Sequence, residues 1–393
     1  MILDLVLWGS IGLLAYAWGV YPLLIVAVAP RQRRPPVVTP SCKTAAILVS
    51  AHNEERVIEA RLQNLLDCAL GAGGGEPPRY TIYLGVDGAG DKTLEVARAY
   101  AARHAFIRVH DVPVRRGKTA MLRDLAAMGR EELLVFTDAN TLFERDALTI
   151  LLARFSDPEV GGVCGRLVFS ERPQAQTRER EYWNWEGILK RKESALDSCL
   201  GANGAIYAIR RELFWEAIPV NTIVDDFVIG MKVREQGYRM IYEPDAVARE
   251  EAPHRIKHEW KRRVRIGAGA YQALWLCRKC LLPRYGRFAW MFFSHKVLRW
   301  FSPHLLLALF AVSLGLLIRG TDGIRTDRGL IGVLALLFLT AAVIGRLLRG
   351  SSAAVARPFQ LCAYFLAMQA ALFQGFLRFC RGDLSGAWQR TAR

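Results

Sequence analysis

The sequence predicts an α/β domain that is carried by transmembrane helices, and three observations lead to this prediction. Short apolar runs alternate with longer amphipathic stretches between about residues 37 and 249, which is typical of an α/β domain. Long uncharged apolar runs lie near both ends, and 52% of the 393 residues are hydrophobic. Three of the expected strands end in polar clusters, and ligands of open α/β sheets bind at this edge.

The apolar runs predict four membrane-spanning helices. The first run extends from Leu5 to Ala29 without a charged residue and is long enough to cross a bilayer. A cleaved signal peptide is the alternative, but its basic residues would precede the apolar run, whereas Arg31, Arg33 and Arg34 follow it. The other three runs lie near the C-terminus, at residues 301–318, 329–345 and 358–377.

The basic residues predict the orientation in the membrane. By the positive-inside rule, Arg31 to Arg34 are cytosolic, which places the N-terminus outside and the central domain in the cytosol. We therefore expect an integral protein of the inner (plasma) membrane, with a helix and basic flank at 1–36 and a catalytic domain at 37–252. Basic interfacial helices at 253–300 and membrane helices at 301–393 follow, with membrane lipids as partners. The basic tail around Arg378 and Arg390 leaves the C-terminal topology open.

Charge and cysteine content narrow the class of partner. Lys and Arg exceed Asp and Glu by 16, which indicates an anionic partner such as a phosphate-bearing substrate or anionic lipid. Nucleic acid is excluded because the basic residues cluster beside apolar spans and no recognition motif is present. The eight cysteines are scattered, and Cys277 and Cys280 lack the second pair that a structural zinc site needs. We expect reduced, mostly structural cysteines.

Three buried strands are expected at residues 44–50, 80–86 and 132–137. Common nucleotide-binding motifs do not fit the segments around them. Gly117-Lys118-Thr119 resembles the end of a P-loop, but the earlier glycine would fall at Val112. A dinucleotide fingerprint beginning at Gly85 would need a glycine at Asp87.

Two acidic motifs are candidates for chemistry. Asp138-Ala139-Asn140 supplies two oxygen ligands at positions i and i+2 after a strand, where they can hold a divalent cation, and an Asx turn is the alternative. Asp225 and Asp226 open an apolar helical stretch. Acids at a helix N-terminus are normally caps or complements of the helix dipole, so this second motif is ambiguous by itself.

In chain order, these motifs resemble the GT-A domain of processive family 2 glycosyltransferases, the group of cellulose, chitin, hyaluronan and poly-N-acetylglucosamine synthases. The resemblance covers about residues 44–271, and the flanking transmembrane helices also suit this family. It implies a Rossmann-like GT-A fold and a nucleotide-sugar donor. The residues that match the donor-binding motifs are Ala51, Asn53, Glu54, Asp87, which contacts the nucleotide base in the family, and Lys118.

The same resemblance implies the catalytic and metal-binding residues. Asp138 and Asn140 occupy the place of the family's metal-binding Asp-x-Asp, which implies a divalent cation, Mg or Mn. Asn140 departs from that pattern and brings no charge, so Asp138 is the expected main ligand. Asp226 matches the family's general base. Asp225 stands on the acceptor side, where the family has a Glu.

The remaining motifs concern the acceptor and the diphosphate. The segment from Gly201 to Ala205 resembles the acceptor-side loop, with Asn203 and Gly204 as acceptor residues, and a simple turn is the alternative. Arg265 matches the arginine of the family's Gln-x-x-Arg-Trp, which lies by the donor diphosphate. Arg262 and Ile266 replace the Gln and Trp, which puts processive polymerisation in doubt.

These observations predict an inverting glycosyltransferase that moves a sugar from a nucleotide-sugar donor to a polysaccharide or glycan acceptor at the membrane. Transfer of a single sugar to a lipid-linked acceptor is one alternative. A non-catalytic nucleotide-binding membrane module is the other, and the presence of both Asp138 and Asp226 argues against it. Product length separates the first two, and release of nucleoside diphosphate separates both from the third.

Overall fold

The computed structural model describes residues 2–30, 44–70, 80–169, 177–251, 256–319, 327–348, 351, 353 and 355–384. The chain forms two compact units. The α/β unit comprises Ile25–Arg255, Gln272–Met291 and Leu384–Arg393, and the helical unit comprises Met1–Leu24, Ile256–Tyr271 and Phe292–Asp383. The basic cluster at residues 31–34, on which the expected orientation rests, lies outside the described residues.

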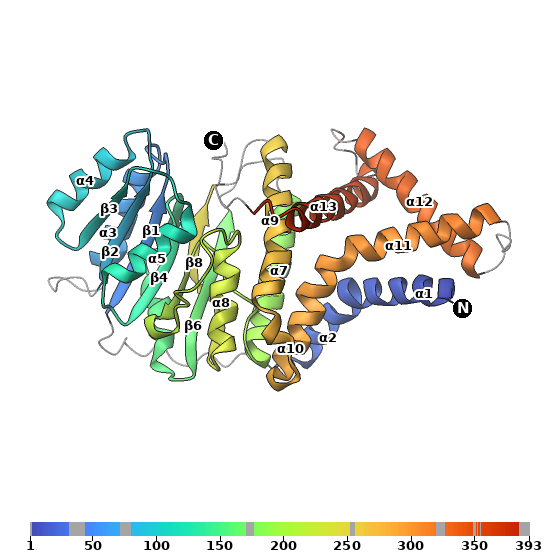
Figure 1. The fold of residues 1–393 in the computed structure, drawn as a ribbon, viewed down its shortest axis with the longest axis horizontal. Coiled ribbons are helices and arrows are strands. Elements are labelled where there is room, and N and C mark those ends of the chain that lie inside the picture. Colours follow the sequence, from blue (N-terminus) through green and yellow to red (C-terminus); the bar gives the residue numbers. More distant parts are fainter. Residues whose placement is uncertain are drawn as a thin grey trace. The chain divides into compact units, whose positions relative to one another are not determined.

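The α/β unit contains one eight-stranded mixed sheet in the order β3-β2-β1-β4-β7-β6-β8-β5 (Figure 1). Strands β3, β2, β1 and β4 are parallel, whereas β7 runs antiparallel to both β4 and β6. The three predicted strands correspond to β1, β2 and β4, and the α/β fold class is confirmed. The strands are β1 (Ala45–Ala51), β2 (Tyr80–Asp87), β3 (Ile107–Val112), β4 (Leu133–Asp138), β5 (Thr141–Phe143), β6 (Val160–Phe169), β7 (Tyr207–Arg210) and β8 (Arg239–Glu250).

Helices cover both faces of this sheet because both faces of its central strands are apolar. Ile47 and Val49 of β1 pack in one core cluster with Leu62 of α3. On the other face, a Cβ added at Gly85 would lie 2.2 Å from Met121 Sδ, so α5 packs closely against β2. The helices of this unit are α3 (Ile58–Leu70), α4 (Thr93–Arg103), α5 (Lys118–Met128), α6 (Ala147–Ala153), α7 (Thr177–Leu196), α8 (Asp225–Glu235) and α10 (Arg287–Met291).

The strand register brings the polar loops together at one edge of the sheet. Ser50 near the end of β1 pairs with Gly85 in β2 and with Asp138 in β4, so the loops after these strands emerge side by side. The predicted convergence of the polar clusters is therefore confirmed. Helix α8 begins at this edge as well. A Cβ added at Gly230 would lie 2.9 Å from the backbone of Gly201, so this glycine lets α8 approach the loop before β7.

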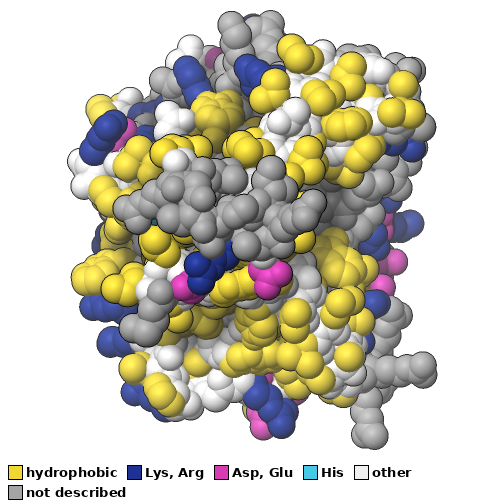
Figure 2. All heavy atoms as spheres, turned by 90° about the vertical axis from the view of Figure 1, so that its right-hand side faces the viewer, with side chains coloured by type: hydrophobic (Ala, Val, Ile, Leu, Met, Phe, Trp, Pro, Cys, Tyr) yellow, Lys and Arg dark blue, Asp and Glu magenta, His cyan; other side chains and the backbone are white. Residues whose placement is uncertain are grey.

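Four helical segments among the described residues are long and apolar enough to cross a membrane, as the sequence predicts: Ile2–Val28, Arg287–Leu316, Asp327–Leu347 and Ala356–Cys380. Apolar side chains are spread over the face drawn in Figure 2. Leu5 and Ile318 are 75% and 76% exposed, which suits contact with lipid rather than water. The helices of the helical unit are α1 (Ile2–Ala15), α11 (Leu298–Arg319), α12 (Asp327–Leu347) and α13 (Ala356–Cys380), whereas α2 (Tyr21–Val28) and α9 (Ile256–Leu276) are divided between the two units.

The segment expected to form interfacial helices at 253–300 is divided in the structure. Ile256–Tyr271 groups with the helical unit, whereas Gln272–Met291 groups with the α/β unit. Gln272 accepts a hydrogen bond from the backbone N–H of Ile223 over 2.9 Å, which anchors this segment. The second span begins at Arg287 instead of residue 301, because α10 continues through a π-helical turn at Phe292–Val297 into α11.

Candidate active site

Charged side chains from three elements surround Gly204. A Cβ added at Gly204 would lie 3.1 Å from Asp138 Oδ2, 3.2 Å from Lys118 Nζ and 3.5 Å from Asp226 Oδ2. Lys118 Nζ lies 2.7 Å from Asp138 Oδ1 and 3.8 Å from Asp225 Oδ2. The structure thus brings together residues that the sequence predicts as separate motifs. We call Lys118, Asp138, Asp225 and Asp226 the charged cluster.

The charges in this cluster depend on one another. Burial disfavours the Lys118 ammonium, but the three carboxylates around it outweigh that effect and raise its pKa above the usual range. Burial raises the pKa of Asp225 to about 6, against the opposing effect of Lys118 and with a further contribution from Asp226. Lys118 therefore stays protonated, beside acids that repel one another.

Asp87 fixes the position of Lys118. Its buried carboxylate accepts hydrogen bonds of 2.7 Å from the backbone N–H groups of Arg116 and Gly117. Gly117 has a φ of 94°, a conformation that glycine adopts readily, and α5 begins at the next residue. Asp87 therefore orients the loop that delivers Lys118 to the cluster. The contact of Asp87 with a nucleotide base stays a prediction.

The loops after β1 and β2 are bonded to each other. Asn53, which has a φ of 55°, accepts a hydrogen bond from the Gly90 N–H over 2.8 Å. The backbone N–H of Glu54 donates to Thr93 Oγ1 over 2.8 Å. These bonds hold the residues that follow Ala51, the last residue of β1, against the second loop. The donor-binding roles of Ala51, Asn53 and Glu54 stay predictions.

Asn140 is held by a residue that the sequence does not single out. Its Nδ2 donates to Glu250 Oε1 over 2.5 Å, because β5 and β8 pair with Thr141 opposite Glu250. Glu250 lies more than 100 positions away along the chain, so this contact is visible only in the fold. At position 140 an amide stands where the family's Asp-x-Asp has a carboxylate. In the structure, the carboxylate of Glu250 lies directly beside this amide.

The acceptor-side loop turns Asn203 inward and leaves Gly204 at the cluster. The Asn203 amide donates to the Gly165 carbonyl over 2.8 Å and accepts from the Ile206 N–H over 3.2 Å. Asn203 is buried, whereas Gly204 is partly exposed. The side chain of Asn203 therefore shapes the loop. The acceptor roles of Asn203 and Gly204 stay predictions.

The two acids at the start of α8 differ in accessibility. Asp225 is buried, and its Oδ2 has no hydrogen-bond partner among the described residues. Asp226 is partly exposed, and its Oδ1 accepts the Phe227 N–H over 2.8 Å. Asp226 is therefore the member of the pair that a bound molecule can reach, which agrees with its expected role as a base. The assignment stays a prediction.

Arg265 lies in α9 and belongs to the helical unit. Its side chain is partly buried, as is that of Arg262 one turn earlier. The expected contact of Arg265 with a donor diphosphate stays a prediction.

The described cysteines are free and mostly buried, as expected for structural residues. Cys277 and Cys280 are both fully buried in the α/β unit. Burial raises the pKa of Cys280 to about 12, so its thiol stays protonated at neutral pH.

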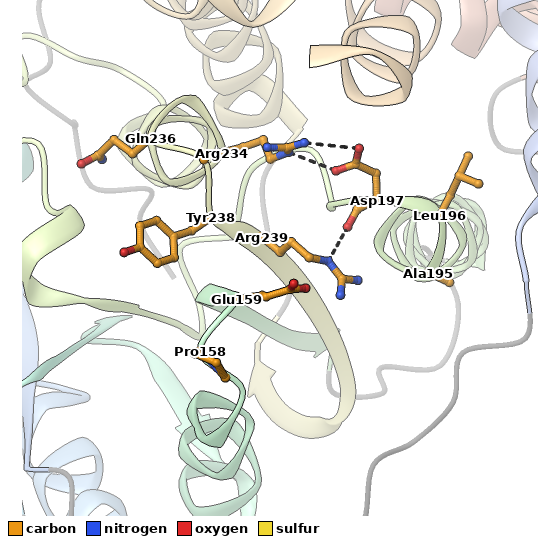
Figure 3. A pocket seen from close by; sticks show the side chains of 10 residues that line it. Pro158, Glu159, Ala195, Leu196, Asp197, Arg234, Gln236, Tyr238 and Arg239 are labelled. Carbon is orange, nitrogen blue, oxygen red and sulfur yellow. Dashed lines mark hydrogen bonds and ion pairs between the residues drawn. The ribbon is translucent and has the colours of Figure 1, made fainter. Parts of the chain in front are cut away.

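A separate hollow of about 740 Å³ lies at the C-terminal ends of α7 and α8 (Figure 3). Arg234 and Arg239 line it, and both bond to Asp197, through its carboxylate and its carbonyl respectively. None of its lining residues belongs to the charged cluster, which lies at the opposite end of α8. The guanidinium groups in this hollow are already engaged by the protein, and we assign it no ligand.

Comparison with known proteins identifies the family. Residues 42–269 match the family described as glycosyltransferase like family 2, a span that contains the whole charged cluster. The chain therefore belongs to the family 2 glycosyltransferases.

Similar proteins come from two Staphylococcus species and from Pyrobaculum calidifontis. Poly-beta-1,6-N-acetyl-D-glucosamine synthases of Staphylococcus aureus (strain COL) and Staphylococcus epidermidis are 24% and 25% identical over 62% and 58% of this chain. The matched regions span 58% and 55% of those relatives, which is less than two thirds of their length. A mannosyltransferase from Pyrobaculum calidifontis, solved in complex with GDP-Man and Mn2+, aligns with a TM-score of 0.70 at 22% identity. That alignment covers 97% of this chain and 99% of the other, and it confirms the GT-A fold.

The Asn140 to Glu250 bond predicts the effect of restoring an acid. Asn140→Asp places a second carboxylate against Glu250, where the two repel unless a cation lies between them. We expect a lower melting temperature in chelator, and a larger recovery on adding Mn2+ than the wild type shows, with metal affinity kept or tightened. Thermal unfolding with EDTA or Mn2+ measures this, and a loss of about 1 kcal/mol corresponds to roughly 2–4 °C.

The double variant Asn140→Asp with Glu250→Gln is the control. It restores a donor beside the new carboxylate and should melt near the wild-type temperature in EDTA. Equal melting temperatures of Asn140→Asp and wild type in EDTA would show that Glu250 does not act on position 140.

Proposed function

We propose that this protein is an inverting glycosyltransferase that moves a sugar from a nucleotide-sugar donor to a glycan acceptor at the cytosolic face of the inner (plasma) membrane. The observation that carries the proposal is the convergence of Lys118, Asp138 and Asp226 around Gly204. A transferase of this kind needs a cationic region for the diphosphate and a base for the acceptor hydroxyl, and the cluster offers both within one space.

The donor end of the site is built on Asp138, Asn140 and Lys118. No group of three or more His, Cys, Asp or Glu side chains suited to a metal occurs in the described part of the chain. Asp138 and Asn140 would hold a Mg2+ or Mn2+ ion through one carboxylate and one amide oxygen, ligands that such hard cations accept. The ion would supply positive charge that offsets the negative charge of the leaving diphosphate. The positive charge of Lys118 acts in the same direction.

The acceptor end of the site is built on Asp226 and Gly204. In an inverting transfer a base takes the proton of the acceptor hydroxyl as that oxygen attacks the sugar. Asp226 is the accessible carboxylate, and Gly204 leaves room for the acceptor beside it because any side chain there would meet Asp138, Lys118 and Asp226. Asp225 lies behind this space, and its burial suits a role in holding Lys118.

The relatives support a polysaccharide product, since two of them are named as synthases of poly-beta-1,6-N-acetyl-D-glucosamine. The mannosyltransferase solved with GDP-Man and Mn2+ supports a nucleotide-sugar donor and a divalent cation. Transfer of a single sugar to a lipid-linked acceptor is the second candidate function. Arg262 and Ile266 favour it, because they replace the Gln and Trp of the processive enzymes.

The roles of the two acids predict different losses. Asp226→Asn keeps the size of the side chain and removes the proton-accepting charge, which typically costs on the order of 10² to 10⁴ in rate. We expect product formation to fall by that much while nucleotide-sugar affinity changes little. Asp138→Asn should weaken metal-dependent donor binding as well. The donor is first identified with full-length protein in nanodiscs, by release of nucleoside diphosphate from a panel of nucleotide sugars.

Near-normal transfer by Asp226→Asn would show that Asp226 only caps α8. Loss of donor binding by Asp226→Asn as severe as that of Asp138→Asn would also contradict the assignment. If the wild type releases no nucleoside diphosphate from any donor, even with added Mg2+ or Mn2+, the proposed function itself is wrong.

Arg265 and Arg262 provide a second, matched comparison. Both lie in α9 and both are partly buried, but only Arg265 matches the arginine that lies by the diphosphate in the family. We expect Arg265→Ala to reduce kcat/KM for the donor far more than Arg262→Ala, because a charge-assisted contact to phosphate is lost. Steady-state kinetics of the two variants measures this, and equal small losses would indicate that the basic stretch only contacts lipid.

A further inference from the structure

Arg61 of α3 is a fully buried cation in the α/β unit. Its guanidinium has no carboxylate within 4.0 Å among the described residues, and it lies 4.2 Å from the centre of the Phe143 ring. Burying an unpaired charge costs several kcal/mol in general. An apolar side chain would fill the same space at a lower cost, so the contacts that Arg61 makes identify its role.

One nitrogen of Arg61 reaches β4. Arg61 Nη2 donates to Thr137 Oγ1 over 2.7 Å, and the Thr137 hydroxyl in turn donates to the carbonyl of Ala205 over 2.8 Å. Thr137 directly precedes Asp138, and Ala205 directly follows Gly204. This chain of bonds therefore joins the strand that carries the metal-binding acid to the loop that carries the acceptor-side glycine.

The other terminal nitrogen of Arg61 bonds to Asn64, which is also in α3 and links the helix to β5. Arg61 Nη1 donates to Asn64 Oδ1 over 2.8 Å. Asn64 holds the backbone of Phe143 by two further bonds: its Oδ1 accepts the Phe143 N–H over 2.8 Å, and its Nδ2 donates to the Phe143 carbonyl over 2.9 Å. The turn that contains Asp138 and Asn140 is thus held at Thr137 by Arg61 directly and at Phe143 by Asn64, to which Arg61 bonds.

We propose that Arg61 is a positioning residue of the transfer site, which holds the Asp138 to Asn140 turn and the Gly204 to Ala205 loop at a fixed separation. The inference rests on the proposed function of the charged cluster. A planar fork with two terminal nitrogens makes both sets of bonds at once, whereas the single ammonium of a lysine does not reproduce this geometry. The separation matters because displacement of a reacting group by about 1 Å costs roughly 100-fold in rate.

Asp138 also acts on Arg61 through its charge. Burial lowers the pKa of the Arg61 guanidinium to about 9, and the negative charge of Asp138 opposes this effect. The guanidinium therefore stays protonated at neutral pH.

The sequence contains a signal for this residue that composition alone does not reveal. Arg61 stands three residues after Ile58, one before Leu62 and four before Leu65, so it lies on the apolar face of α3 that packs against the sheet. A charged residue on the buried face of a helix requires a specific set of partners.

The test compares Arg61→Met with Arg154→Met in full-length protein. Arg154 is also buried and pairs with Glu243 of β8 over 2.6 Å, so its loss destabilises the same unit through a different ion pair. Hydrogen exchange is measured for residues 137–143 and 203–207, and kcat and KM are measured at a temperature where each variant is folded. We expect Arg61→Met to speed exchange in both segments and to lower kcat by roughly 10- to 100-fold. Arg154→Met should do neither.

Two milder variants, Thr137→Val and Arg61→Lys, keep the test decisive if Arg61→Met does not fold. Thr137→Val removes the hydroxyl that links Arg61 to Ala205 and should speed exchange at 203–207. Because both variants break the same chain of bonds, their effects on kcat should not add. Exchange and kcat that stay at wild-type values in both variants would overturn the proposal, as would a uniform rise in exchange across the unit. Because exchange needs no substrate, it decides the role of Arg61 even if no nucleotide sugar is turned over.

Discussion

The ion pair between Lys118 and Asp138 is the interaction on which the site depends. The carboxylates of Asp138 and Asp226 lie beside Gly204, that of Asp225 lies near Lys118, and like charges so placed repel one another. Lys118 offsets this repulsion at 2.7 Å from Asp138 and 3.8 Å from Asp225. Its position follows from Asp87, whose two oxygens fix the loop before α5. Loss of the Asp87 bonds would free the loop that positions Lys118, whose positive charge offsets the repulsion among the three acids.

Much of the site could be predicted from sequence because its residues follow strands of one parallel sheet. The end of a buried strand is a local signal, and parallel strands place their carboxyl ends at a common edge. This signal predicts Asp87 and Asp138 as site residues. The start of α8 is equally local, since Asp225 and Asp226 precede an apolar helical stretch. The family resemblance then related these separate motifs to one another.

The remaining contacts depend on pairings between distant parts of the chain. Glu250 reaches Asn140 only because β8 runs beside β5 at the far edge of the sheet. The inward turn of Asn203 depends on the carbonyl of Gly165 in β6, and no residue pattern near Asn203 encodes it. The apolar pattern also does not predict that the second membrane span starts at Arg287, because a π-helical turn carries α10 into α11 through polar residues that interrupt the apolar run.

The central claim is that the charged cluster binds the diphosphate of a nucleotide sugar, and a direct view of a bound nucleotide tests it most sharply. Cryo-electron microscopy of the full chain in nanodiscs with Mn2+ and the nucleoside diphosphate of its donor would locate both ligands. The account predicts a metal ion within about 2.0–2.6 Å of an Asp138 oxygen, with the diphosphate beside Lys118. A nucleotide bound elsewhere, such as in the hollow lined by Arg234 and Arg239, would contradict it.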